Sequence, residues 1–111
     1  MRYAITSTGC QQTSDMDMRF GRCSCLVFYD TESGSVEFLP NPYRELDDEV
    51  GPRLVELVAE RGIQRIVSGS FGFKIKPLLD SKKIQMIIPN EPGITVGKII
   101  RIIGNSAVQA R

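Results

Sequence analysis

The residues best suited to chemistry lie in one loop between two strand-like runs, from Asp15 to Cys25. These eleven positions contain two arginines, two cysteines, two aspartates and a glycine. Arginine guanidinium groups bind anions through paired N–H donors, and thiolates bind soft metals. The chain contains no histidine, which removes the residue most often used for proton transfer. The loop therefore favours ligand binding over catalysis.

Cys10, Cys23 and Cys25 are candidate metal ligands. Antiparallel pairing of the first two strands would bring Cys10 near the other two, and Cys23 and Cys25 share a face if the second strand begins there. Three thiolates suit Cu(I), zinc or an iron–sulfur species. A C-x-C pair is less specific than paired C-x-x-C motifs, and core packing remains open for Cys25. A redox role through Cys23 and Cys25 is the weakest interpretation, because C-x-C lacks the geometry that lowers a thiol pKa.

Two further groups of residues could contact an anionic ligand. Arg19 and Arg22 can present guanidinium forks, with Phe20 between them as an anchor and Gly21 giving flexibility. The alternative is a pair of surface charges bound to nearby aspartates, worth at most about 1 kcal/mol. The turn containing Gly69, Ser70 and Gly72 allows close approach of backbone N–H groups. Its alternative is a simple tight turn between a strand and a helix.

The acidic residues do not indicate an enzyme. Asp15 and Asp17 lie in a loop, and the first strand carries no carboxylate. A two-metal nuclease needs several acids on rigid strands. Asp47, Asp48 and Glu49 are explained by favourable charge at the start of a helix. We therefore expect a protein without catalytic residues.

Hydrophobic periodicity predicts eight elements in the order βββαβαβα. The first three strands form an antiparallel meander, and the later strands are joined through helices with right-handed crossovers. This is an α/β fold around a five-stranded mixed sheet. The loop after the first strand, the Gly69–Gly72 turn and the segment from Pro89 to Thr95 should meet at the carboxyl ends of the parallel strands. The strands are expected at 3–8, 26–29, 35–39, 63–68 and 84–88. A first helix should begin near Val50 and end before Gly62 as its C′ residue, a second should carry Ile75, Leu78 and Leu79 inward, and a third should begin after Thr95 as N-cap and end before Gly104.

Composition places the chain among single-domain globular proteins. It has 111 residues, 41% of them apolar, and a formal net charge of +1. This charge gives no reason to expect a nucleic-acid or membrane partner, and no apolar run approaches the roughly 20 residues that span a bilayer. We expect a cytoplasmic protein with free thiols. The domain should cover residues 1–104, followed by a short polar tail at 105–111.

Several segments together resemble the dinitrogenase iron–molybdenum cofactor biosynthesis family, the NifX-like proteins and the cofactor-binding domain of NifB-type proteins. The most specific is Asp17-Met18-Arg19-Phe20-Gly21-Arg22-Cys23, which follows Thr6-Ser7-Thr8-Gly9. The likeness continues through residues 57–63, 67–72 and 93–96. The resemblance implies a three-layer ribonuclease H-like fold that lacks nuclease acids. It also implies non-catalytic binding or transfer of an iron–sulfur or molybdenum-containing cluster, or its precursor.

The resemblance assigns residues to the two walls of a ligand site. Arg19, Phe20, Gly21 and Arg22 would belong to the ligand loop, and Gly69, Ser70 and Gly72 to the opposite wall. Gly9, after the first strand, is a further candidate binding residue. The chain departs from the family at Met18, where members often have proline, and at Cys23, where they often have a small residue. The expected function is that of a carrier for an anionic cluster, with a possible protein partner in cluster transfer. The alternative is a cofactor-free interaction or regulatory module that uses the third strand or the acidic 45–49 segment.

Overall fold

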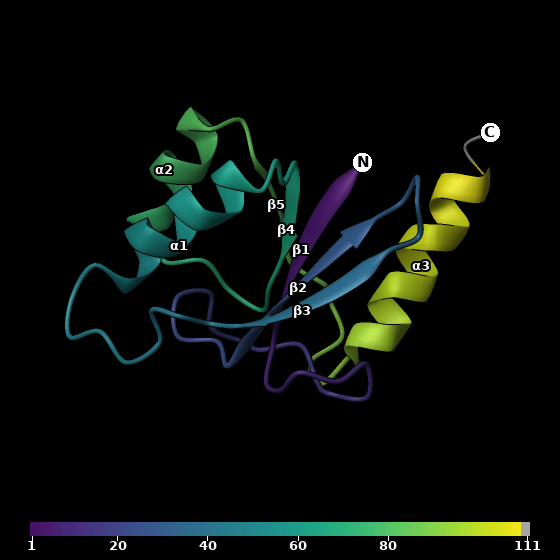
Figure 1. Ribbon diagram of the computed structural model, residues 1–111, viewed down its shortest axis with the longest axis horizontal. Coiled ribbons are helices and arrows are strands. Elements are labelled where there is room, and N and C mark those ends of the chain that lie inside the picture. Colours follow the sequence, from purple (N-terminus) through teal and green to yellow (C-terminus); the bar gives the residue numbers. More distant parts are fainter. Residues whose placement is uncertain (110–111) are drawn as a thin grey trace.

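The sheet has five strands and is covered by helices on both faces (Figure 1). The structure is a computed structural model that describes residues 1–109. The strand order across the sheet is β3-β2-β1-β4-β5. In chain order the elements are β1 (Arg2–Ser7), β2 (Cys25–Asp30), β3 (Val36–Pro40), α1 (Val50–Glu60), β4 (Arg65–Val67), α2 (Ile75–Ser81), β5 (Gln85–Ile87) and α3 (Val96–Gln109).

Strand directions confirm the predicted mixed sheet. β1 pairs antiparallel with β2, in a register that places Ser7 opposite Cys25. β2 in turn pairs antiparallel with β3. β1 also pairs in parallel with β4, and β4 with β5. The order βββαβαβα is thus as the sequence pattern predicts, and the three-layer ribonuclease H-like arrangement is as the family resemblance implies.

Alternation along the strands supplies two separate cores. Ala4, Leu26 and Phe28 point to the face covered by α1 and α2, where they pack with Leu54 and Leu79. Their neighbours Tyr3, Ile5, Val27 and Tyr29 point to the other face and pack with Val96 and Ile99 of α3. A sheet buried on both faces needs this double set of apolar residues. Figure 1 shows the two layers, with α1 and α2 on one side of the strands and α3 on the other.

The helix boundaries confirm some sequence expectations and correct others. Gly62, with φ of +71°, follows α1 as expected for a C′ glycine, and Thr95 Oγ1 accepts a hydrogen bond of 3.2 Å from the Lys98 amide as an N-cap. The prediction that Leu78 points inward is wrong, because its side chain is 36% exposed. The predicted helix end at Gly104 is also wrong, since α3 continues to Gln109 and takes in part of the expected tail.

A disulfide joins Cys10 to Cys25, across the loop between β1 and β2. Antiparallel pairing of these strands does bring Cys10 to the start of β2, as predicted. The expectation of free thiols is wrong for these two residues, and Cys23 is the free cysteine. The cross-link encloses the whole arginine-containing loop, with a sequence separation of 15 residues.

Reducing this disulfide should lower the stability of the fold. A closed loop of this length removes chain entropy from the unfolded state worth up to about 3 kcal/mol. We expect the melting temperature to fall by about 8–12 °C in a phosphine reductant, measured by circular dichroism. Cys10→Ser should show the lower value with and without reductant. An unchanged melting temperature on reduction of the wild-type protein would contradict the prediction.

None of the helices within residues 1–109 has both the length and the apolar character needed to cross a membrane.

A cation-lined cleft beyond the parallel strands

The three segments predicted to converge do meet beyond the carboxyl ends of the parallel strands. The loop after β1 forms isolated bridges between Ser7 and Met16 and between Asp15 and Thr95. The Met16 amide donates to the Ile94 carbonyl at 2.8 Å. The Gly69 amide donates to the Asp17 carbonyl at 3.1 Å. Figure 1 shows the loop after β1 passing beside the segment that precedes α3.

On the side of α3, the space where the three segments meet is filled by the chain itself. The Val96 and Gly97 amides, at the start of α3, donate to the carbonyls of Ser14 and Gln12 at 2.9 and 2.8 Å. These helix N-terminal donors are therefore already satisfied and do not face a ligand. Gly9 lies on this closed side: a Cβ there would come 2.8 Å from Ser14 Oγ. Its neighbours give Gly9 a packing role in the loop.

On the other side is an open cleft of about 550 Å³ between the arginine loop, α1 and α2. Of the predicted ligand residues, Arg19, Phe20, Gly21, Arg22, Ser70 and Gly72 line it, whereas Gly9 and Gly69 do not. The cleft therefore brings together most of the two walls expected from the sequence. Its complete lining is Arg19, Phe20, Gly21, Arg22, Asp48, Glu49, Val50, Gly51, Pro52, Ser70, Gly72, Lys74, Ile75 and Leu78.

Asp17 is buried and holds the start of the arginine loop. Its Oδ1 accepts hydrogen bonds from the Arg19 amide at 2.9 Å and from Arg19 Nε at 3.3 Å. Its backbone carbonyl accepts from Thr6 Oγ1 at 2.9 Å. The hydrogen bond to Asp17 and the charge of its carboxylate raise the pKa of Arg19 above its ordinary value. Arg19 is thus paired through one edge while its side chain stays 58% exposed.

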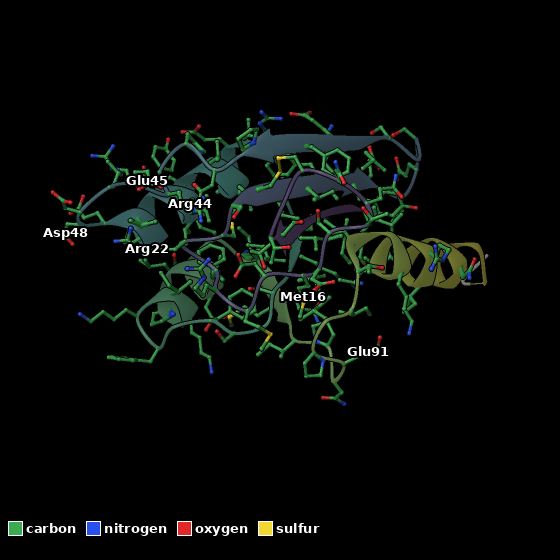
Figure 2. The ribbon with its side chains drawn as sticks, turned by 90° about the horizontal axis from the view of Figure 1, so that it is seen from below. Met16, Arg22, Arg44, Glu45, Asp48 and Glu91 are labelled. Atoms are coloured by element: carbon green, nitrogen blue, oxygen red, sulfur yellow. A yellow bond between two sulfur atoms is a disulfide. The ribbon has the colours of Figure 1, made fainter. Side chains whose placement is uncertain are left out.

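Arg22 and Gly21 connect the loop to the segment before α1. Arg22 Nη1 donates to the Arg44 carbonyl at 2.7 Å. Figure 2 shows Arg22 close to Arg44, at the end of the molecule away from α3. Gly21 lies directly against α1, because a Cβ on it would be 3.4 Å from Gly51 N. The arginine loop therefore runs along the first turn of α1.

The start of α1 faces the cleft without a side-chain cap. Val50, Gly51 and Pro52 line the cavity, and Glu49 makes no capping hydrogen bond through its side chain. The first amides of an α-helix have no intrahelical acceptor and carry partial positive charge. Pro52 has no N–H, so Val50 and Gly51 supply the donors of this turn. A Cβ on Gly51 would overlap Cδ1 of Ile75, so this side chain would have to move if any other residue stood there.

The turn after β4 has two different roles. Gly69 is packed beneath the arginine loop, since a Cβ there would lie 2.5 Å from Met18 Cα, and its amide is bonded to Asp17. The predicted close approach is thus to the protein's own backbone. Ser70 Oγ donates to the Met18 carbonyl at 2.6 Å. In the described part of the chain, the amides of residues 70–74 have no hydrogen-bond acceptor, so they remain available to a ligand or solvent.

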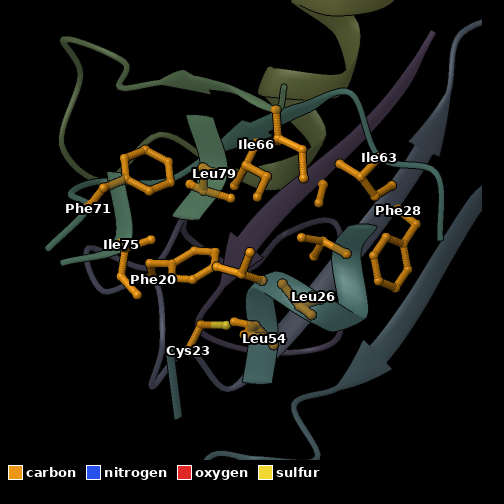
Figure 3. Close-up of a cluster of buried hydrophobic side chains, with 14 residues drawn as sticks. Phe20, Cys23, Leu26, Phe28, Leu54, Ile63, Ile66, Phe71, Ile75 and Leu79 are labelled. Atoms are coloured by element: carbon orange, nitrogen blue, oxygen red, sulfur yellow. The ribbon is translucent and has the colours of Figure 1, made fainter. Parts of the chain in front are cut away.

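Phe20 anchors the loop in the core, as the sequence predicts. It is 4% exposed, and its ring centroid lies 5.7 Å from that of Phe71. Figure 3 shows both rings within the apolar cluster, to which α1 contributes Leu54 and α2 contributes Leu79. One edge of this anchored residue forms part of the cleft lining.

The three cysteines do not come together as a metal site. Cys23 packs with Leu54 in the core beneath α1 (Figure 3), whereas Cys25 is bound to Cys10. The prediction of a shared face for Cys23 and Cys25 holds only if the second strand begins at Cys23. This condition is not met, because β2 begins at Cys25. Burial, with a smaller contribution from the Asp17 carboxylate, raises the pKa of the Cys23 thiol to about 12. Within residues 1–109, no group of three or more Cys, Asp or Glu side chains is placed to hold a metal ion.

Sequence reasoning missed Asn41, which organises the loop from the side of β3. Its Nδ2 donates to the carbonyls of Gly21 and Cys23 at 2.8 and 3.0 Å, and its side chain is buried. The signal available was an asparagine between two prolines, a combination that marks a turn with side-chain hydrogen bonds. Lys74 was also missed, because a surface lysine before a helix carries no distinguishing pattern.

A cleft beyond the carboxyl ends of parallel strands, lined by three cations, two carboxylates and an uncapped helix start, is a candidate ligand site in a small α/β domain. The chain belongs to the dinitrogenase iron–molybdenum cofactor family, whose model matches residues 1–105. The family resemblance drawn from the sequence is confirmed.

Solved structures that share this fold include an orange protein and a putative NifB protein. The apo form of the orange protein from Desulfovibrio gigas is 24% identical with a TM-score of 0.84, covering 95% of this chain and 88% of that one. A putative NifB protein from Thermotoga, solved by NMR, is 28% identical with a TM-score of 0.78, covering 94% and 87%. No curated protein matches the sequence.

Proposed function

We propose that this protein is a non-catalytic carrier that binds an anionic iron–sulfur or molybdenum-containing cluster, or its precursor, in the cleft. The observation that supports this proposal most is the convergence of Arg19, Arg22 and Lys74 with the uncapped start of α1 on one open cavity. Membership of the iron–molybdenum cofactor family supplies the chemical class of the cargo.

The donors around the cleft suit the outer sulfur or oxygen atoms of a cluster anion better than its metal ions. Guanidinium and ammonium groups and backbone amides donate hydrogen bonds and carry positive charge. The side chain of Cys23 is buried in the core, and Cys10 and Cys25 are joined to each other. We therefore revise the thiol ligation expected from the sequence and propose that the cargo is held by charge and hydrogen bonds.

The apolar part of the lining strengthens these interactions. Phe20, Val50 and Ile75 are buried and form the inner apolar lining of the cleft, and exposed Pro52 lies at its border. Apolar walls lower the local dielectric constant, so that charge pairs formed against them are screened less than on an open surface. A large, weakly hydrated sulfide anion fits such a mixed environment.

Binding of tetrathiomolybdate tests the proposal. The double variant Arg19→Gln/Arg22→Gln should weaken binding by at least about tenfold, because each charge-assisted hydrogen bond contributes about 1.5–3 kcal/mol. Arg101→Gln, which removes one exposed charge from α3 in the opposite layer, should bind as the wild type does. Affinity is measured by absorbance titration under anaerobic conditions at two salt concentrations.

Two results would contradict the proposal. Equal affinity of the wild type and the double variant would remove the arginines from the site. A loss of binding in Cys23→Ser, with fold and melting temperature retained, would restore the thiol ligation that we have set aside. Reconstitution with iron and sulfide in the same variants extends the comparison to iron–sulfur cargo.

The proposal includes the place where the carrier works. Exchange of a cluster between biosynthetic proteins would occur in the cytoplasm, with a protein partner that delivers or accepts the cargo. The cofactor-free interaction module is the outcome if neither cargo binds.

A further inference from the structure

A basic and apolar surface lies beside the cleft, on α2 and the residues that flank it. The segment from Phe73 to Lys83 contains four of the five lysines of the chain and one carboxylate, Asp80. It also contains Phe73, which is 81% exposed and is the most exposed of the large apolar side chains described. Leu78 adds a second partly exposed apolar side chain. We call this the α2 surface: Phe73, Lys74, Lys76, Leu78, Lys82 and Lys83.

The α2 surface is not neutralised by the protein itself. Ion pairs among the described residues involve Lys98 and several arginines, but none of the four lysines of the α2 surface. The segment therefore keeps a net charge of about +3, counting four lysines against Asp80. A concentrated charge on a chain with a net charge of +1 points to a negatively charged partner.

The exposed apolar residues are not explained by packing. Ile75 and Leu79 bury their side chains against the core and fix the orientation of α2. Phe73 and Leu78 face away from that core, and contact of a phenylalanine ring with water is unfavourable. Aromatic residues of this kind are common anchors at protein interfaces.

We propose that the α2 surface docks an acidic segment of a partner protein, with an apolar side chain of that segment covering Phe73. Carboxylates of the partner would pair with the lysines, and the apolar contact would fix the register. The surface adjoins the cleft, because Lys74 and Leu78 belong to both. A partner held there would sit at the cleft mouth. The inference goes beyond cargo binding and stands on the α2 surface alone.

A protein segment fits this surface better than an anionic membrane. α2 has seven residues, and two of them, Ile75 and Leu79, are committed to the core. The helix cannot turn an apolar face toward lipid without unpacking. Membrane-surface helices bury a long apolar face in the interface, whereas this surface offers Phe73 and Leu78.

A random library of 16-residue peptides displayed on phage tests the proposal. Selection on the wild-type protein should enrich peptides that combine several Asp or Glu residues with an aromatic or aliphatic residue. Phe73→Ser/Lys76→Glu should bind the enriched peptides at least about tenfold more weakly, measured by fluorescence anisotropy. The control Ile102→Ser/Arg101→Glu makes matched changes on the exposed part of α3 and should bind them as the wild type does.

The outcomes separate this inference from its alternatives. Absence of enrichment, enrichment of neutral or basic peptides, or equal binding by the Phe73→Ser/Lys76→Glu variant would overturn it. Stronger binding to vesicles containing phosphatidylserine than to any enriched peptide would overturn it in favour of a membrane surface. Neither Phe73 nor Lys76 lines the cleft, so tetrathiomolybdate binding should be unchanged in the variant and reports separately on the proposed function.

Discussion

Replacing Gly69 with valine is expected to lower the free energy of unfolding by about 3–5 kcal/mol. The new Cβ would lie 2.5 Å from Met18 Cα, a distance that requires the arginine loop to move. That movement would also break the hydrogen bond from the Gly69 amide to the Asp17 carbonyl. For a domain of this size the melting temperature should fall by about 12–20 °C, measured by circular dichroism or calorimetry.

Gly72→Val is the matched control for this prediction. A Cβ on Gly72 would meet only Ile75 Cγ1 among the described neighbours, at 3.9 Å, which is ordinary van der Waals contact. We expect a change within about 1 kcal/mol, as for other exposed positions. Similar melting temperatures for the two variants would show that the loop does not pack against Gly69 as described.

The Cys23 thiol of the native protein is expected to react with an alkylating reagent at least about a thousandfold more slowly than the unfolded chain. Two effects act together: Cys23 is fully buried, and burial raises the pKa of its thiol to about 12, so that little thiolate forms. The rate is measured with iodoacetamide by mass spectrometry, with the disulfide intact. Fast modification in the native state would contradict the buried position of Cys23.

The same pKa shift predicts a loss of stability at high pH. The folded state keeps the Cys23 proton up to a pKa of about 12, whereas the ordinary value is 9.0. Between these values the unfolded state releases a proton that the folded state retains, so stability falls as pH rises, by up to about 1.4 kcal/mol per pH unit. Below pH 9 this contribution is constant. Cys23→Ser should show a shallower decline from pH 9 to 11 in denaturant titrations.

The element order and the meeting of three loops could be predicted because both depend on backbone patterns. Alternation in β1 and β2 identifies two buried faces, and parallel strands place their following loops at one edge. No comparable rule predicts the direction in which a side chain in a loop points. Cys23 lies two residues before the start of β2, so its direction is set by Phe20 and Asn41, which hold the loop on either side of it.

The roles of glycines are equally hard to predict from the sequence. Gly104 looks like a helix end in the sequence, yet α3 passes through it. A Cβ at that position would come 3.0 Å from Tyr29 Oη, so the glycine allows the helix to cross close to β2. Gly69 likewise serves the approach of one loop to another. A sequence shows that a glycine is present; only tertiary contacts show whether it serves a turn, a ligand or a neighbouring backbone.

The carboxylates of Asp48 and Glu49 border the cleft together with its cations. In the proposed carrier role, negative charge at the edge of the cleft would affect the rate at which an anionic cargo dissociates. Each carboxylate repels a bound anion, which weakens retention and favours fast dissociation. In this role, a receiving protein would then need only moderately tighter binding for transfer to be favourable. These two carboxylates would favour transient binding of cargo over storage.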